Sequence, residues 1–109
     1  MAVNSDLMRG VAEPVILKLL AERTMYGYEI IRLVNERTNG AFEWKEGTLY
    51  PCLHRLEEQG LIESSWLLAG AKPRKYYSIT RKGIAAMEEK VREAKEFVGA
   101  LHLLLGAAN

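Results

Sequence analysis

Apolar residues recur at steps of three and four along residues 11–40, which is the spacing of amphipathic helices. A first helix is predicted over residues 11–22, with Pro14 tolerated in its first turn. A second lies within residues 25–40 and is ended by Asn39 and Gly40. The inward stripes are Val15, Ile16, Leu19 and Leu20 in the first helix and Ile30, Ile31, Leu33 and Val34 in the second. Residues 1–10 are polar and mixed, and we expect them to be ordered only where another element packs on them.

Residues 45–62, KEGTLYPCLHRLEEQGLI, combine a polar face, an apolar packing face and both ends of a predicted helix. They are predicted to form a helix from Gly47 or Thr48 to Gly60, with Thr48 as its cap and Pro51 in its first turn. One face packs and carries Leu49, Cys52, Leu53 and Leu56, whereas the polar face carries Thr48, Tyr50, Pro51, His54, Arg55 and Glu58. Such a polar face suits entry into the major groove of DNA, although an ordinary solvated face would have the same pattern.

Three further segments are compatible with β-strands. Phe42 and Trp44 alternate with polar residues, so residues 41–47 are predicted to add a short strand. Residues 61–68 and 74–79 are predicted to form a two-stranded hairpin, with Gly70 and Pro73 as turn markers between them. The tip and the return strand carry Lys72, Arg74, Lys75, Tyr76 and Tyr77. Long cations on a projecting hairpin suit phosphate contact, and the alternative interpretation is that they keep an edge strand soluble.

A last helix is predicted from Arg81 to about Leu105, capped by Thr80. Its apolar residues form a heptad seam of Ile84, Met87, Val91, Ala94, Val98, Leu101 and Leu105, widened by Phe97, Leu103 and Leu104. At ~1.5 Å per residue the helix reaches about 37 Å and outruns a small core. We therefore expect a homodimer whose interface includes Val91, Ala94, Phe97, Val98, Leu101 and Leu105. The alternative is a helix folded back on its own domain.

Length and composition set further bounds on the function. With 109 residues and 49% apolar content, the chain is expected to form one domain. The net charge is only +1, but residues 64–87 hold no acidic residue and five cations: Lys72, Arg74, Lys75, Arg81 and Lys82. A single cysteine fits a reducing, cytoplasmic setting. The apolar run 11–21 is interrupted by charges and too short to span a bilayer, so no membrane role is expected.

Neither catalysis nor metal binding is expected. Cys52 lies on the predicted apolar face, and no Ser/His/Asp set, HExxH motif or Gly-rich phosphate loop is present. His54 and Glu58 are spaced as a possible pair of metal ligands, but a structural zinc site needs four ligands and nothing is positioned to complete it. We therefore expect no cofactor and no metal.

Three blocks of the sequence resemble the PadR-type winged helix-turn-helix regulators. They are YGYEI at 26–30, GTLYPCLHRLEEQGLI at 47–62 and PRKYYSITRKG at 73–83, and the resemblance covers about residues 11–105. It implies an α+β, mostly α fold. Residues 1–80 would form a winged helix-turn-helix with a two-stranded wing, and residues 81–109 a long C-terminal dimerisation helix within one compact unit. It also implies a homodimer on a palindromic operator in double-stranded DNA, and family members are mostly repressors.

Residue by residue, the resemblance implies DNA contacts for Tyr26, Thr48, Tyr50, Arg74, Lys75 and Tyr76. Lys45, His54, Arg55 and Lys72 are added because they share the predicted polar face or the wing tip. Some short members also bind flat aromatic drugs between tryptophans of the paired C-terminal helices, but here Trp44 and Trp66 lie outside that helix. Phe97 could line a pocket for a small aromatic effector, although it is more simply interface packing. The alternative function is a winged-helix module that binds protein, which salt dependence would distinguish from DNA binding.

Overall fold

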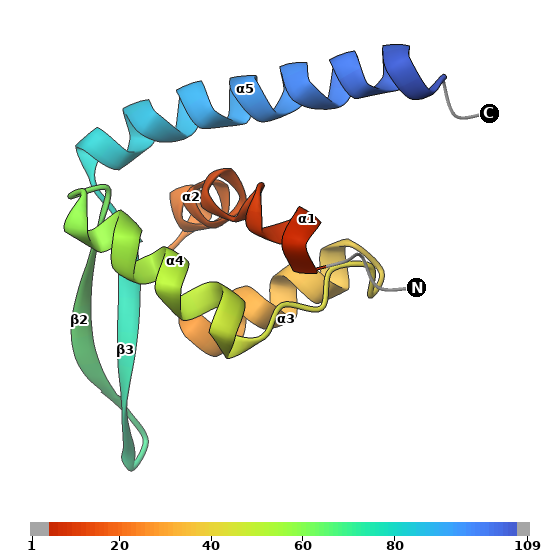
Figure 1. The fold of residues 1–109 in the computed structure, drawn as a ribbon. Helices are drawn as coiled ribbons and strands as arrows, with labels where there is room; N and C mark the ends of the chain where they lie inside the picture. Colours follow the sequence, from red (N-terminus) through yellow and green to blue (C-terminus); the bar gives the residue numbers. More distant parts are fainter. Residues whose placement is uncertain (1–4, 107–109) are drawn as a thin grey trace.

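The computed structural model describes residues 5–106. Residues 1–4 of the N-terminal segment and residues 107–109 of the predicted C-terminal segment lie outside the described residues. The elements in chain order are α1 Ser5–Arg9, α2 Ala12–Glu22, β1 Met25–Tyr26, α3 Gly27–Arg37, α4 Glu46–Glu58, β2 Ile62–Ala69, β3 Lys72–Ile79 and α5 Arg81–Leu105. Helices α1 to α4 form a cluster, the β2–β3 hairpin projects past α4, and α5 runs across the opposite side (Figure 1). The predicted class, mostly helical with a two-stranded wing and a long last helix, is confirmed.

The core lies between α2, α3 and α4 and is closed by the base of the hairpin. All four residues predicted for the packing face of α4 are buried, as are Ile16, Leu19 and Leu20 of α2 and Ile30 and Val34 of α3. Leu17 is also buried, whereas Val15, Ile31 and Leu33 are partly buried against the core. Met8 of α1 is buried in the same core. Residues 5–9 therefore form a helix that packs on the core, in line with the expectation that this segment is ordered where it packs.

The sheet differs from the prediction in its third strand. Its order is β1-β3-β2, and β1 pairs Met25 with Tyr77 and Tyr26 with Tyr76. The strand predicted within residues 41–47 is wrong, because residues 41–45 have no strand partner. The backbone there is satisfied by side chains instead: the Phe42 N–H donates to Thr38 Oγ1 at 3.0 Å, and Asn35 Nδ2 donates to the Phe42 carbonyl at 3.4 Å. The alternation of Phe42 and Trp44 reflects two rings packed on the core.

The hairpin is confirmed, with one correction at its tip. Strands β2 and β3 pair antiparallel along their whole lengths, and the turn between them is Gly70 and Ala71, with Gly70 at a φ of 68°. Pro73 was predicted as a turn marker, but it lies within β3 opposite Leu68. Because β1 pairs only with Tyr76 and Tyr77, β3 has a single neighbour at Pro73, where a missing N–H is tolerated.

Helix α4 begins earlier than the sequence predicted. Lys45 is its N-cap, so the prediction of Thr48 as the cap is wrong, and Pro51 lies in the second turn instead of the first. The Gly47 carbonyl therefore lacks the N–H that residue 51 would otherwise donate. Thr48 lies four residues before Cys52 and is buried with it, 9% exposed, so its predicted place on the polar face is also wrong.

Strand β3 passes into α5 through Thr80 alone. The Thr80 hydroxyl accepts the Gly83 N–H at 3.0 Å and donates to the Gly60 carbonyl at 2.7 Å, which confirms the predicted cap. Gly83 is buried, and a Cβ there would lie 2.0 Å from the Leu61 carbonyl oxygen. Helix α5 therefore starts pressed against the backbone that follows α4. Within residues 5–106, neither α5 nor a shorter helix has the length and apolarity needed to cross a membrane.

Candidate nucleic-acid interface

The outer face of the sheet brings together three of the predicted DNA contacts. The Tyr26 and Tyr76 rings meet edge to face with centroids 5.4 Å apart, and the Arg74 guanidinium carbon lies 4.5 Å from the centroid of the Tyr26 ring. Tyr26 is held in turn, because its backbone N–H donates to the Glu29 carboxylate at 3.2 Å. A cation over an aromatic face is attracted by the ring quadrupole. Arg74 is therefore placed by packing before any partner arrives.

Residues of β1, the hairpin, α3 and α4 line a cleft of 390 Å³. Its lining residues are Tyr26, Gly27, Tyr28, Tyr50, Trp66, Pro73, Arg74, Lys75 and Tyr77. Tyr50 reaches it from α4 by lying over Gly27, where an added Cβ would come 2.3 Å from the Tyr50 hydroxyl. Lys75 lies with its Nζ 5.7 Å from the centroid of the buried Tyr77 ring. The cleft therefore joins the predicted reading helix to the predicted wing.

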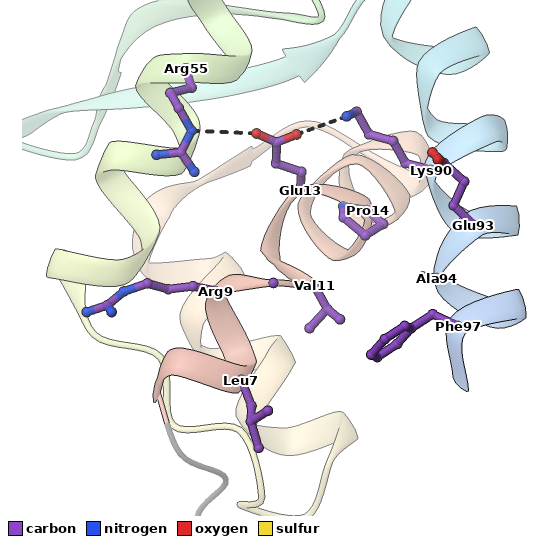
Figure 2. Close-up of a pocket in the computed structure, with 11 residues that line it drawn as sticks. Leu7, Arg9, Val11, Glu13, Pro14, Arg55, Lys90, Glu93, Ala94 and Phe97 are labelled. Atoms are coloured by element: carbon purple, nitrogen blue, oxygen red, sulfur yellow. Dashed lines mark ion pairs between the residues drawn. The ribbon is translucent and has the colours of Figure 1, made fainter. Parts of the chain in front are cut away.

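The remaining polar residues of α4 divide between two sides. His54 is exposed one turn after Tyr50 and lies 3.6 Å from Glu58, and Lys45 is exposed at the start of the helix. Arg55 departs from the prediction that it shares their face. Its Nε lies 3.6 Å from Glu13 of α2, whose other oxygen lies 3.0 Å from Lys90 Nζ of α5 (Figure 2). Arg55 sits three residues after buried Cys52, which turns it toward α2.

This ion-pair chain borders a groove of 560 Å³ between α2 and α5 (Figure 2). Leu7, Val11, Pro14 and Phe97 give it apolar walls, and Glu13, Arg55 and Lys90 lie at one side. A second groove of 530 Å³ is lined by Val91, Ala94 and Val98 of α5 together with Val15, Leu19 and Phe42. Within the predicted dimer seam, Met87 therefore packs on the core and Val91 and Ala94 face α2 of the same chain, whereas Ile84 is exposed. Phe97, Val98, Leu101 and Leu105 remain exposed.

Two exposed aromatic residues of the cleft, Tyr28 and Trp66, were missed as site residues in the sequence. Trp66 is 66% exposed, although it is the largest side chain on the hairpin. Residues two apart in a strand lie on the same face. Trp66 is two residues from Ser64, and Ser64 pairs with buried Tyr77, so Trp66 lies on the inner face of the hairpin. Lys72 is exposed beside the hairpin tip, as predicted for its position.

The described residues form neither a set of metal ligands nor a reactive thiol. Within residues 5–106, no group of three His, Cys, Asp or Glu side chains is close enough to hold an ion. Burial raises the pKa of the Cys52 thiol to about 11, so the group stays protonated and is a poor nucleophile at neutral pH.

Comparisons with known proteins agree with this arrangement. The family described as "Transcriptional regulator PadR-like family" matches residues 16–89. A transcriptional regulator of Mycobacterium tuberculosis is 38% identical over 91 residues, covering 84% of this chain and 82% of that protein. An uncharacterised protein of Lysinibacillus sphaericus is 41% identical over 105 residues, covering 94% and 95% of the two chains. The solved structure of a transcriptional regulator from Clostridium thermocellum superposes with a TM-score of 0.81 at 35% identity, covering 92% and 95%.

The matched family and the relatives from Mycobacterium tuberculosis and Clostridium thermocellum are described as transcriptional regulators. The matched segment runs from α2 through the reading helix and the wing into α5. The blocks at 26–30, 47–62 and 73–83 that carry the resemblance all fall inside it. The chain therefore belongs to the PadR-like family of transcriptional regulators.

Proposed function

We propose that the protein is a homodimeric repressor that binds a palindromic operator in double-stranded DNA, with α4 in the major groove and the β2–β3 hairpin as a wing on the phosphates. The observation that carries this proposal is a charge pattern placed by the fold. Lys72, Arg74 and Lys75 lie on a hairpin that flanks the exposed face of α4, and residues 64–87 contain no acidic side chain to oppose them. Such a surface attracts the DNA backbone by releasing its counterions.

The two elements divide the labour of recognition. The long cations of the wing suit phosphates, which fix orientation but carry no sequence information. Tyr50 and His54 lie one turn apart on the exposed side of α4, with Lys45 at its start, and a helix of this kind can reach base edges. Thr48 and Arg55 are the weakest members of the predicted set, because one is buried and the other is paired with Glu13.

The second copy is expected to cover the far half of α5. Beyond Ala94 the helix exposes Phe97, Val98, Leu101, Leu104 and Leu105 on one side, and Leu103 is exposed on the other. An apolar strip such as that of the first five residues is typical of a subunit interface. A two-fold dimer presents two reading helices, which is why we propose an operator with inverted half-sites.

Binding is tested by fluorescence anisotropy of labelled DNA taken from upstream of the protein's own gene, against a shuffled fragment, at two salt concentrations. We expect tight binding to the native fragment that weakens as salt rises. Salt-sensitive binding of equal strength to both fragments would mean that the protein binds DNA but that its operator does not lie upstream of its own gene. Absence of binding to either fragment at low salt would contradict the proposal and favour a protein-binding module.

Replacing Arg74 and Lys75 together by alanine is expected to weaken binding to native and shuffled DNA alike, by about tenfold or more at low salt. Two lost phosphate contacts should also reduce the slope of log K against log salt by about two. Tyr50→Ala should instead change the ratio between the two fragments. The double variant Lys18→Ala and Arg92→Ala removes the same charge far from the wing and is the control. A fall in that control equal to the wing variant would show that only net charge matters.

Gly27→Ala is expected to weaken DNA binding with little change in thermal stability. The new Cβ would overlap the Tyr50 hydroxyl at 2.3 Å and Cζ at 2.8 Å, and the ring can avoid it by swinging out of the cleft. The measurement is anisotropy together with a thermal melt. In a Tyr50→Ala background the same change should have no further effect on binding, because the ring it displaces is gone. A full additional loss there would mean that Gly27 acts without Tyr50.

Relief of repression by a small aromatic ligand is the final part of the proposal. The groove in Figure 2 has apolar walls, Phe97 among them, and lies between the DNA-binding helices and α5. An occupant would press on the contact between α2 and α5 and so on the relative position of the two reading helices. Titration of flat aromatic compounds into the labelled DNA complex tests this, and release of DNA at saturable concentrations is the expected result.

A further inference from the structure

The inner face of the hairpin continues beyond the core that it helps to close. Residues that pair across two antiparallel strands share a face, and on this face the pairs are Ile62 with Ile79, Ser64 with Tyr77, Trp66 with Lys75 and Leu68 with Pro73. Ile62 and Tyr77 are buried, but Trp66 and Leu68 are 66% and 77% exposed. The same face that begins as core therefore ends as an open apolar surface with one cation in its middle.

The opposite wall of this surface comes from the DNA-binding helices. Tyr28 at the start of α3 and Tyr50 of α4 are both exposed and line the 390 Å³ cleft that Trp66 and Lys75 line from the hairpin. Figure 1 shows the hairpin descending beside α4, so the cleft is lined from both the hairpin and the DNA-binding helices. Two aromatic walls and a cation therefore face a gap between the reading helix and the wing.

We propose that this cleft receives one sugar–phosphate strand of the DNA duplex, with Trp66 packed on a deoxyribose and Lys75 on the adjacent phosphate. The inference rests on the proposed function and adds Trp66 and Tyr28 to the binding surface. The occupant must match both apolar rings and cations, and the sugar–phosphate backbone alternates apolar C–H groups with negative charge. An apolar protein partner that covered Trp66 and Leu68 would also cover Lys75, which shares their face, and would leave its charge without a counter-charge.

Fluorescence quenching tests the placement directly, because the two tryptophans of the chain differ in exposure. Trp44 is 2% exposed, so quenching of the native protein by acrylamide reports mainly on Trp66. Acrylamide is neutral, and DNA does not repel it as it would iodide. Adding a mixed-sequence duplex at low salt should protect Trp66 and reduce the quenching slope. The Trp66→Phe variant retains only Trp44, whose quenching should be weak and unchanged by DNA.

The salt dependence of binding separates the roles of the two paired residues. Trp66→Ala should lower the affinity on the order of tenfold at every salt concentration, the loss typical of one aromatic contact to nucleic acid. The slope of log K against log salt should not change, because no cation is removed. Lys75→Ala should reduce that slope by about one. Trp66→Phe should retain most of the affinity, because it keeps an aromatic ring at this position.

The outcomes distinguish this inference from the function on which it rests. DNA binding with unchanged quenching of Trp66 and undiminished affinity of Trp66→Ala would overturn the cleft assignment and leave the repressor proposal intact. Absence of DNA binding by the native protein would overturn both. A change in the sedimentation of free Trp66→Ala, with its DNA affinity preserved, would assign the surface to protein contact instead. Circular dichroism should confirm that the variants fold, since Trp66 is exposed.

Discussion

Replacing Gly83 with alanine is expected to lower the free energy of unfolding by about 3 kcal/mol or more. The added Cβ would lie 2.0 Å from the Leu61 carbonyl oxygen and 2.7 Å from Ile79 Cγ1. The carbonyl cannot move away easily, because it accepts the Thr80 N–H at 3.0 Å and the Thr80 hydroxyl at 3.1 Å. The clash is therefore with fixed backbone, and relieving it means separating α5 from the segment after α4.

A thermal melt followed by circular dichroism measures this effect, and a fall in the midpoint of about 10 °C or more is expected. Gly47→Ala is the matched control, because Gly47 is also helical but a Cβ there meets nothing within 4 Å. It should leave the midpoint unchanged or raise it slightly, since alanine is the better helix former. Equal midpoints for the two variants would show that α5 tolerates a side chain at Gly83.

Leu101→Asp is expected to convert a dimer into monomers. Leu101 lies in the middle of the apolar strip that α5 exposes beyond Ala94, between Val98 and Leu105. A second copy covering this strip would bury the new carboxylate without a partner, at a cost of several kcal/mol. Because a monomer can no longer engage two half-sites at once, its affinity for a palindromic operator should fall about 100-fold or more. Sedimentation velocity at micromolar concentration measures the first effect and anisotropy the second.

Ala100→Asp controls for the added charge. It places the same carboxylate one residue away, at a heptad position that points away from the seam, and should sediment as the native protein does. A native protein that is monomeric at micromolar concentration would contradict the assignment of this strip to a dimer. Dissociation by both variants alike would point to charge repulsion along α5 instead of a buried seam.

The packing face of α4 and the hairpin could be predicted because each is encoded locally. Leu49, Cys52, Leu53 and Leu56 repeat with the helical period, and β2 and β3 are β-compatible runs with turn residues between them. Strand β1 had no such signal. It is two residues long and exists only because β3, some fifty residues later, pairs with it. The same distance effect explains the mistaken strand at 41–47, where rings alternate in a loop that packs on the core.

Two residues of α4, Thr48 and Arg55, were assigned to the wrong part of the helix surface. Thr48 was placed among the polar residues by its hydroxyl, yet its spacing of four from Cys52 already put it on the packing face. Arg55 lies at the border between the two faces, and a border residue turns toward whichever neighbour offers a charge. That neighbour is Glu13, from a helix whose position relative to α4 no local pattern reveals.

The heptad spacing of α5 did not reveal that part of the predicted seam packs within the same chain. Met87 packs on the core and Val91 and Ala94 face α2 of the same chain, whereas Val98, Leu101 and Leu105 are exposed. A periodic stripe shows that a helix has a face to bury but not what buries it. Which part of the stripe packs on α2 depends on the tertiary arrangement.

Only Thr80 separates β3 from α5, so α5 is attached rigidly to the wing. The hydroxyl of Thr80 binds on both sides of the joint, and Gly83 presses the helix on Leu61, so bending there is opposed. With a length of about 37 Å at ~1.5 Å per residue, a tilt of about 10° displaces the far end by about 6 Å, nearly two base-pair steps of ~3.4 Å. In a dimer joined at those far ends, the tilt of α5 would set the half-site spacing that the two wings can span.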